Sequence, residues 1–410
     1  MIQIAILITL SLAALKRKNQ ILFALLAPVF VLGDSRITLA KTLYLLVLII
    51  LNLIYAPSTL EISIVYIIKK MNIINKLLIF LLIQIIIVGI YNSFSIVEVV
   101  RSSVILLIFL LNFRLILNSF RFWNYNQAYM FLILVGLIGA ISTFYTWIQR
   151  RGVLELQTDR LALDADYFAI LAICISIYTN RIGIAGFKRN FEIIITSVMV
   201  VFLLATLSRT YIVLLSFIFI FALFKNTEKR IRQYLRNLSV VSLTIALLLI
   251  FTRLLNEMQY QILQTRIFDS VALISKSHNT SSNSYLESLT IRKAQGLMAR
   301  DMWLQSPIFG KGALPSGFTF DSIFGAFAKY GIIGIVLICL ILLILYQTLN
   351  SGISKSSLEH GIATFIFIVL VPSSLIGNWT ENKSVWLSIN LILFLLLVRN
   401  YETNEKREIG

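Results

Sequence analysis

Residues 306–348 read SPIFGKGALPSGFTFDSIFGAFAKYGIIGIVLICLILLILYQT. The first part is a polar turn that contains Pro and Gly, and the second part, from residue 322, is a continuous apolar run. About 20 apolar residues are enough to cross a hydrocarbon layer of about 30 Å. The turn closes the longest polar interval of the chain, which also carries Arg292 and Asp321. This pattern predicts a transmembrane helix joined directly to a polar site at a membrane surface.

The composition extends this prediction to the whole chain. Of 410 residues, 58% are hydrophobic and 13% are charged, and the mean hydropathy is +0.88. A soluble core of this size could not hide so much apolar surface, so we expect an all-α, polytopic transmembrane helical bundle, with residues 1–410 as a single integral membrane domain. The continuous Leu- and Ile-rich runs argue against a closed barrel of alternating strands.

The net charge of +17 does not indicate nucleic acid as a partner. The basic residues cluster in short loops between apolar runs, where the positive-inside rule expects them. Cys174 and Cys339 both lie inside apolar runs, so we expect them to be packing residues, without a disulfide or a metal site. No small-residue cleavage site follows the first run, which we therefore expect to be retained.

The apolar runs suggest about 11–13 spans. They occupy residues 2–15, 21–33, 37–55, 76–91, 99–117, 127–148, 165–180, 191–207, 210–224, 236–252, 322–348, 361–376 and 384–398.

Loop charge orients these runs. Basic clusters at 16–18, 69–70, 121, 188–189 and 225–236 mark cytoplasmic loops. Alternation from the last cluster places 149–166, Ser208-Arg209, 253–322 and 378–383 on the outer face and the C-terminal tail inside. Two alternatives remain open at the N-terminus: 13 spans with an outer N-terminus, or a half-spanning hairpin at 2–33 with the N-terminus inside. Residues 56–70 are a candidate interfacial helix.

Three outer-face features carry polar chemistry. The smaller outer loop, 149–166, contains Arg150, Arg151 and Arg160 mixed with acids. It could be a salt-bridged loop in which Asp164 and Asp166 cap the next helix. The second feature is Arg209 in a short break between two runs. An arginine near a helix centre costs roughly 2.5–3.5 kcal/mol, so it requires an anion, a wet cavity or a path by which its side chain reaches lipid phosphate.

The third feature is the large outer loop, 253–322, which contains seven Lys or Arg and five Asp or Glu. Apolar residues recur at helical spacing between Tyr285 and Leu304, so we expect an amphipathic helix on the mouth of the bundle. Lys293 and Arg300 lie seven residues apart and share one face of that helix. Pro307 should end it. A solvated basic face is the alternative interpretation, and we prefer it for Lys293 and Lys311.

The ordered motifs resemble the O-antigen polymerase and O-antigen ligase superfamily of polytopic membrane glycosyltransferases. The resemblance covers the chain from about residue 149 to its end. It rests on Thr158-Asp159-Arg160 followed by Asp164-Ala165-Asp166, on Leu207-Ser208-Arg209-Thr210, and on Arg292, Ser306 to Gly312, Asp321-Ser322 and Lys329 to Gly334. It implies a GT-C-like fold and metal-independent glycosyl transfer from a lipid diphosphate at the outer face of the bacterial cytoplasmic membrane. It implies no cofactor.

In this resemblance Arg160, Arg209 and Arg292 match the arginines of the family and would hold the diphosphate. Planar guanidinium groups bind phosphate oxygens bidentately and stabilise the charge of the leaving group. We expect substrate binding by Arg151, Arg160, Arg209, Arg292 and Arg300, and catalysis by Asp321, Arg292 and Arg209. Asp164-Ala165-Asp166 has the spacing of a metal site, but we interpret it as a helix start.

The branch of the superfamily depends on one departure from the pattern. Ligases carry a histidine at the start of the last outer-loop element, and Asp321-Ser322 occupies that position here. This favours a polysaccharide repeat-unit polymerase, with Asp321 as base or acceptor-orienting group or simply as a helix cap. The expected substrate is an undecaprenyl-diphosphate-linked oligosaccharide in membrane lipid, and candidate partners are a chain-length regulator and a flippase. The alternatives are an O-antigen ligase and a lipid-linked oligosaccharide flippase.

Overall fold

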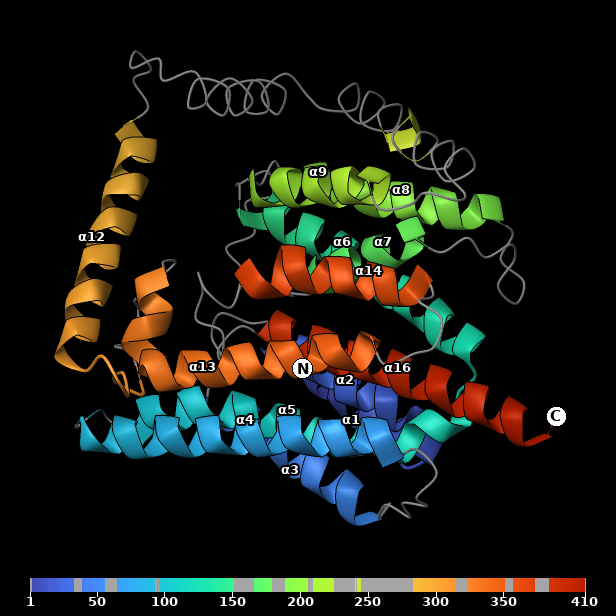
Figure 1. Ribbon diagram of the computed structural model, residues 1–410, viewed down its shortest axis with the longest axis horizontal. Helices are drawn as coiled ribbons and strands as arrows, with labels where there is room; N and C mark the ends of the chain where they lie inside the picture. Colours follow the sequence, from blue (N-terminus) through green and yellow to red (C-terminus); the bar gives the residue numbers. More distant parts are fainter. Residues whose placement is uncertain are drawn as a thin grey trace. The chain divides into compact units, whose positions relative to one another are not determined.

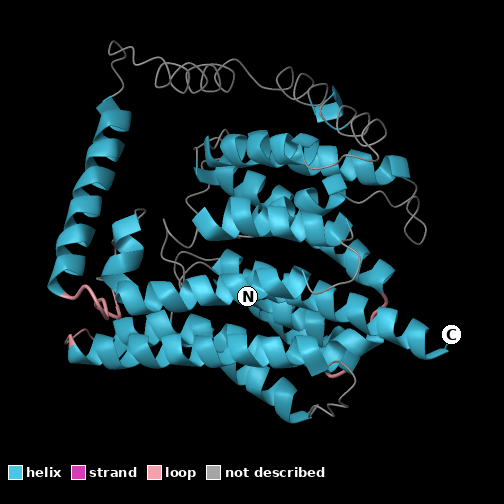
Figure 2. Cartoon of the chain, viewed as in Figure 1, coloured by secondary structure: helices cyan, strands magenta, loops and turns pink. Residues whose placement is uncertain are grey.

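The computed structural model describes residues 2–32, 39–55, 65–92, 94, 96–150, 166–178, 189–205, 209–224, 240, 242–244, 283–313, 323–350, 357–372 and 383–409. Within these ranges the chain is helical apart from short turns, and it contains no strand (Figures 1 and 2). The expected all-helical class is therefore confirmed for the described part of the chain.

The chain divides into two compact units. Unit 1 comprises Met1–Tyr129, Ser288–Ser354 and Val369–Gly410, and unit 2 comprises Met130–Glu287 and Lys355–Ile368. The helices of unit 1 are α1 (Ile2–Ala14), α2 (Gln20–Leu32), α3 (Leu39–Tyr55), α4 (Val65–Tyr91), α5 (Ile96–Ser119), most of α12 (Asn283–Gln305), α13 (Ile323–Asn350) and α16 (Lys383–Ile409), with short 3-10 turns at Arg17–Asn19 and Phe120–Phe122.

Helix α5 is the centre of unit 1, because α2, α3, α4 and α16 all pack against it. Its apolar side chains Leu106, Ile108 and Phe109 are buried in these contacts. The Phe109 ring stacks on Trp386 of α16, with the ring centroids 6.0 Å apart. One turn further along α5, the Asn112 side chain donates a hydrogen bond of 2.9 Å from Nδ2 to the carbonyl of Ala24 on α2.

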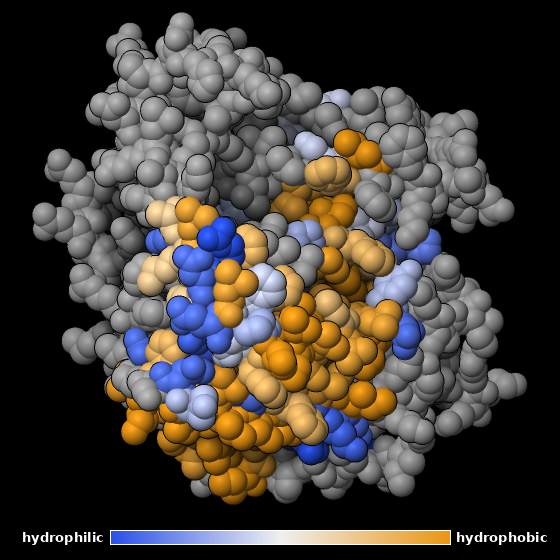
Figure 3. Space-filling model, turned by 60° about the vertical axis from the view of Figure 1, so that its left-hand side comes forward, coloured by the Kyte–Doolittle hydropathy of each residue, from blue (hydrophilic) through white to orange (hydrophobic). Residues whose placement is uncertain are grey.

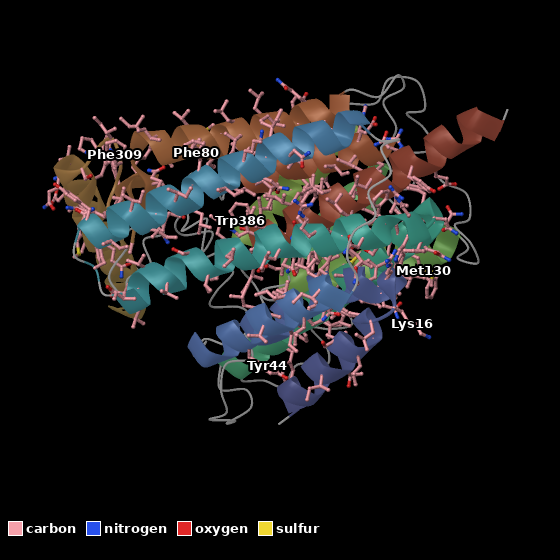
Figure 4. The ribbon with its side chains drawn as sticks, turned by 90° about the horizontal axis from the view of Figure 1, so that it is seen from below. Lys16, Tyr44, Phe80, Met130, Phe309 and Trp386 are labelled. Carbon is pink, nitrogen blue, oxygen red and sulfur yellow. The ribbon has the colours of Figure 1, made fainter. Side chains whose placement is uncertain are left out.

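The basic N-terminal turn, Arg121 and the C-terminal helix meet at one end of unit 1. Trp123 Nε1 donates to the Lys18 carbonyl at 2.8 Å, and the amide of Tyr125 donates to Glu402 at 2.9 Å. Figure 4 shows Lys16 towards the end of unit 1 that is opposite to Phe309. The polar turn between α1 and α2 thus lies with the other predicted cytoplasmic segments.

Unit 2 contains most of α6 (Tyr125–Arg150), α7 (Asp166–Tyr178), α8 (Arg189–Ala205), α9 (Arg209–Phe224) and α14 (Ser357–Phe365), which continues as a π-helix to Leu370. Helix α7 is its core, since every residue from Phe168 to Tyr178 is buried. Gly361 lets α14 approach closely, because a Cβ there would lie 2.6 Å from the Cα of Ile175. Ser176 donates to Glu192 of α8 at 2.9 Å, and Thr364 donates to Tyr178 at 3.1 Å.

Five helices in the described ranges are long and apolar enough to cross a membrane: Asn72–Tyr91, Ile96–Phe122, Tyr125–Tyr145, Phe324–Leu349 and Val385–Glu402. Shorter apolar helices occur at Tyr44–Ile54, Asp166–Tyr178, Phe191–Ala205 and Leu358–Leu370. The chain is thus a helical protein built for a membrane, while the expected total of 11–13 spans includes runs outside the described residues. Residues 65–70 do not form a separate interfacial helix, because they continue directly into α4.

Candidate functional site

The turn after α12 is bonded to a kink in α13. Four backbone hydrogen bonds, two in each direction, join the described residues of these segments: Lys311 N to Ala328 O (2.8 Å), Gly312 N to Lys329 O (2.9 Å), Ile332 N to Pro307 O (3.0 Å) and Ile333 N to Ile308 O (3.1 Å). We call residues 306–313 and 328–333 together the clasp. It unites two motifs that the sequence separates, the Pro/Gly turn and the Lys-Tyr-Gly-x-x-Gly element.

Glycines make this approach geometrically feasible. Gly331 has φ 60° and ψ −173°, so it interrupts the helix and frees the next two amides to donate to the turn. Any side chain at Gly331 would collide with the carbonyl oxygen of Ile308. Gly310 also has a positive φ of 71°, and a Cβ there would lie 2.5 Å from the carbonyl oxygen of Lys329. Residues with a side chain are excluded at both positions by conformation and by space.

Helix α4 binds the clasp from the side. Gln84 Nε2 donates to the Tyr330 carbonyl at 2.7 Å and to the Phe309 carbonyl at 3.1 Å. Asn92 Nδ2 donates to Val88 O at 2.8 Å and makes a longer contact of 3.4 Å with Lys311 O. One glutamine therefore joins both halves of the clasp to a span that is distant from them in sequence.

The expected outer-loop helix is present as α12, and its C-terminal part packs on the first turns of α13. Ala299 and Ala328 are fully buried at this contact, and Met302 packs against them. The Trp303 ring lies 5.2 Å from that of Phe327, centroid to centroid, and its Nε1 donates to the Pro307 carbonyl at 3.2 Å. Two of the apolar residues of this helix, Leu297 and Met298, are 47% and 39% exposed.

A lysine lies inside the clasp. The Lys329 side chain is fully buried, and its Nζ lies 5.7 Å from the centroid of the Tyr330 ring. Burial of an ammonium group is costly unless polar or aromatic groups surround it. The Tyr330 ring is one such group.

The arginines of the large loop lie on α12. Arg292 is placed by its backbone, while its side chain is outside the described part of the structure. Arg300 follows eight residues later, about 12 Å further along the helix axis. Its guanidinium group bonds Asp301 Oδ1 through Nη2 at 3.0 Å and through Nε at 3.2 Å. Because Asp301 offsets its charge and the pair is exposed, Arg300 has a weaker case as an anion-binding residue than Arg292.

Arg209 is the first residue of α9 in unit 2, and its side chain is also outside the described part. Two residues later, Tyr211 donates from its hydroxyl to Asp166 Oδ2 at 2.7 Å. This bond joins the start of α9 to the start of α7. Arg209 and Asp166, the first residues of these two helices, thus lie at the same end of unit 2.

The remaining candidates lie outside the described residues. These are Arg151 and Arg160 of the smaller loop and Asp321, the proposed base. The structure therefore brings together the two glycine motifs of unit 1 and, separately, the two outer elements of unit 2. Within the described ranges no three His, Cys, Asp or Glu side chains gather as a metal site would require.

Gln84 is the residue of this site that the sequence pattern did not identify. One feature of the sequence could have identified Gln84, because it is a polar residue near the middle of the apolar run 76–91. Polar residues within a membrane span usually have a specific partner. No family model matches the chain, and no curated protein matches it. The fold and site define a helical membrane protein in which the turn after α12 is fixed to α13 and α4 by a hydrogen-bonded clasp.

Proposed function

We propose that this chain is a repeat-unit polymerase of bacterial polysaccharides such as O-antigen, capsule or exopolysaccharide. It would work at the outer face of the cytoplasmic membrane, on a GT-C-like helical scaffold. The clasp carries the proposal, because it joins the two motifs on which the resemblance mainly rests and holds α12, which bears Arg292, on the outer end of α13. In unit 2, the hydrogen bond between Tyr211 and Asp166 also supports the proposal.

The proposed reaction is a glycosyl transfer between two lipid carriers. A hydroxyl of the carrier-linked repeat unit attacks the anomeric carbon of the growing glycan, and the bond from that carbon to the diphosphate oxygen breaks. Undecaprenyl diphosphate leaves with the electron pair, and Asp321 takes the proton of the hydroxyl. Arg160, Arg209 and Arg292, with Arg151 and Arg300 as further candidates, would hold the diphosphate and stabilise its developing charge.

The test compares variants in cells that lack the wild-type gene, with insertion of each variant checked by immunoblot. We expect Arg292→Ala and Arg209→Ala to lower polymer formation by at least about 100-fold, as loss of a charge-stabilising donor does. Arg292→Lys should restore little, because lysine keeps the charge but not the planar pair of donors. Lys293→Ala is the matched control and should leave polymer unchanged.

The glycolipid pattern separates the alternatives. Loss of a polymerase leaves single repeat units, whereas loss of a ligase leaves finished polymer on its carrier. Full-length polymer from normally inserted Arg209→Ala and Arg292→Ala proteins would refute the proposed mechanism.

A further inference from the structure

The turn of the clasp runs beside the last two turns of α4, from Gln84, which bonds Phe309, to Asn92, which contacts Lys311. Helix α4 ends at Tyr91, and Gln84, which bonds Phe309, lies seven residues earlier. At 1.5 Å per residue this is roughly 10 Å along the helix axis. The apolar span of α4, Asn72–Tyr91, is 20 residues long and thus about as long as a hydrocarbon layer is thick. With this apolar span set across the hydrocarbon layer, Phe309 would lie at the level of the outer leaflet.

Four carbonyls of the turn have partners in neighbouring segments. Pro307 accepts from Ile332 and Trp303, Ile308 from Ile333 and Phe309 from Gln84, and Lys311 makes the longer contact with Asn92. Non-helical backbone at membrane depth is tolerated only where such partners exist, because lipid offers none. A turn in water would not require this arrangement.

Two neighbouring side chains of the turn, Ile308 and Phe309, are apolar and exposed. Ile308 is 53% exposed and Phe309 is 52% exposed. They are continuous with the exposed apolar side of α4, on which Phe80 is 67% and Ile87 is 61% exposed. Figure 3, which brings the α12 side of the molecule forward, shows a broad hydrophobic area on this face. Lys311, at the upper end of the turn, can extend its ammonium group to the headgroups.

We infer that residues 306–313 form a re-entrant turn, which inserts Ile308 and Phe309 among the acyl chains of the outer leaflet. The partner of this surface is bilayer lipid. The inference depends on membrane insertion of the chain and on the orientation that the loop charges predict, and it stands or falls independently of the proposed glycosyl transfer. If both hold, the lipid-diphosphate substrate meets the protein beside a turn that already lies at the depth of its polyprenyl chain.

Site-directed spin labelling of the full chain in liposomes tests the inference. Nitroxides are attached to Phe309→Cys and, separately, to Ile308→Cys in a Cys339→Ala background, since Cys339 is exposed and Cys174 is buried. The unmutated background provides the blank. Phe80→Cys serves as the lipid-facing reference, and Asp301→Cys, whose side chain is 60% exposed on α12, serves as the water-facing reference.

Oxygen concentrates in lipid, so we expect it to relax the labels at Ile308 and Phe309 several-fold more than a water-soluble nickel chelate does. The Phe80 label should show the same preference, and the Asp301 label should show the opposite one. Relaxation dominated by the nickel chelate would place the turn in water and overturn the inference. Protection from both reagents would mean that protein covers the turn, and this result would overturn it as well. The Ile308 variant keeps the test decisive if the Phe309 variant does not insert.

Discussion

At the scale of the residue, the side-chain amide of Gln84 joins both halves of the clasp to α4. Gln84 donates from one nitrogen to two carbonyls, those of Phe309 and Tyr330, which lie far away along the chain. In an apolar surrounding such a bond contributes chiefly by preventing the cost of unpaired carbonyls. Gln84 therefore contributes more to the free energy of unfolding than its half-exposed position suggests.

Gln84→Leu should lower the melting temperature of the detergent-purified protein. Leucine fills a similar volume but leaves both carbonyls without this donor, at a cost of about 1–3 kcal/mol. Ile83→Leu, at the neighbouring exposed position, is the control and should leave the melting temperature unchanged. Equal melting curves for the two variants would show that the amide bonds contribute nothing to stability.

Gly331→Ala should disrupt the clasp more severely. Alanine is strained at a positive φ, by about 1–3 kcal/mol, and its Cβ also collides with the Ile308 carbonyl. We expect a lower melting temperature together with loss of polymer formation, while Ile332→Ala, on the next and exposed residue, should keep both. A Gly331→Ala protein as stable as the wild type would mean that the kink does not depend on glycine.

At the scale of the element, α12 is held by a small contact. Its described contacts with α13 centre on Trp303, whose ring touches Phe324 and Phe327 and whose indole nitrogen bonds Pro307. The rest of the helix, from Asn283 onward, extends away from this contact (Figure 1). The position of Arg292 on the molecule thus depends on a few side chains at the far end of its helix.

Trp303→Ala should release α12 while leaving the spans folded. Truncation of a buried tryptophan costs about 3–5 kcal/mol, and this half-buried one should fall at or below the low end of that range. We expect faster proteolysis within residues 283–305 and loss of polymer, with little change in helix content by circular dichroism. Leu304→Ala, which removes a side chain that is 61% exposed, should behave as the wild type. Unchanged proteolysis of Trp303→Ala would contradict the role of this contact.

The sequence predicted the elements better than their ends. The run 322–348 became Ile323–Asn350, but α4 begins at Val65, well before the start of its run at 76, and α16 continues to Ile409, well past the end of its run at 398. Hydropathy reports where a helix meets lipid, and a helix continues past that point when its polar residues also favour the helical state. The glycine motifs were found because turns require particular residues. The hydrogen bonds from Gln84 to these motifs were not predicted, because a contact between segments so distant in sequence produces no local periodic pattern.

At the scale of the whole molecule, the candidate arginines are divided between the two units. Arg292 and Arg300 belong to unit 1 and Arg209 belongs to unit 2. The proposed roles of Arg209 and Arg292 require that each of them faces the outer side of the membrane. This requirement depends on orientation, which the loop charges predict from the positive-inside rule alone.

Cysteine labelling tests that orientation directly. In a Cys339→Ala background, Lys16→Cys and Gln305→Cys place single exposed thiols at the basic N-terminal turn and at the end of α12. In intact spheroplasts a membrane-impermeant maleimide should label Gln305→Cys, and it should label Lys16→Cys only after permeabilisation. The expected difference follows from the clasp, which fixes α12 at the end of unit 1 opposite to Lys16 (Figure 4). Labelling of Lys16→Cys alone in intact cells would invert the topology. It would also place Arg292 on the cytoplasmic side, where transfer from an outward-facing lipid diphosphate is impossible.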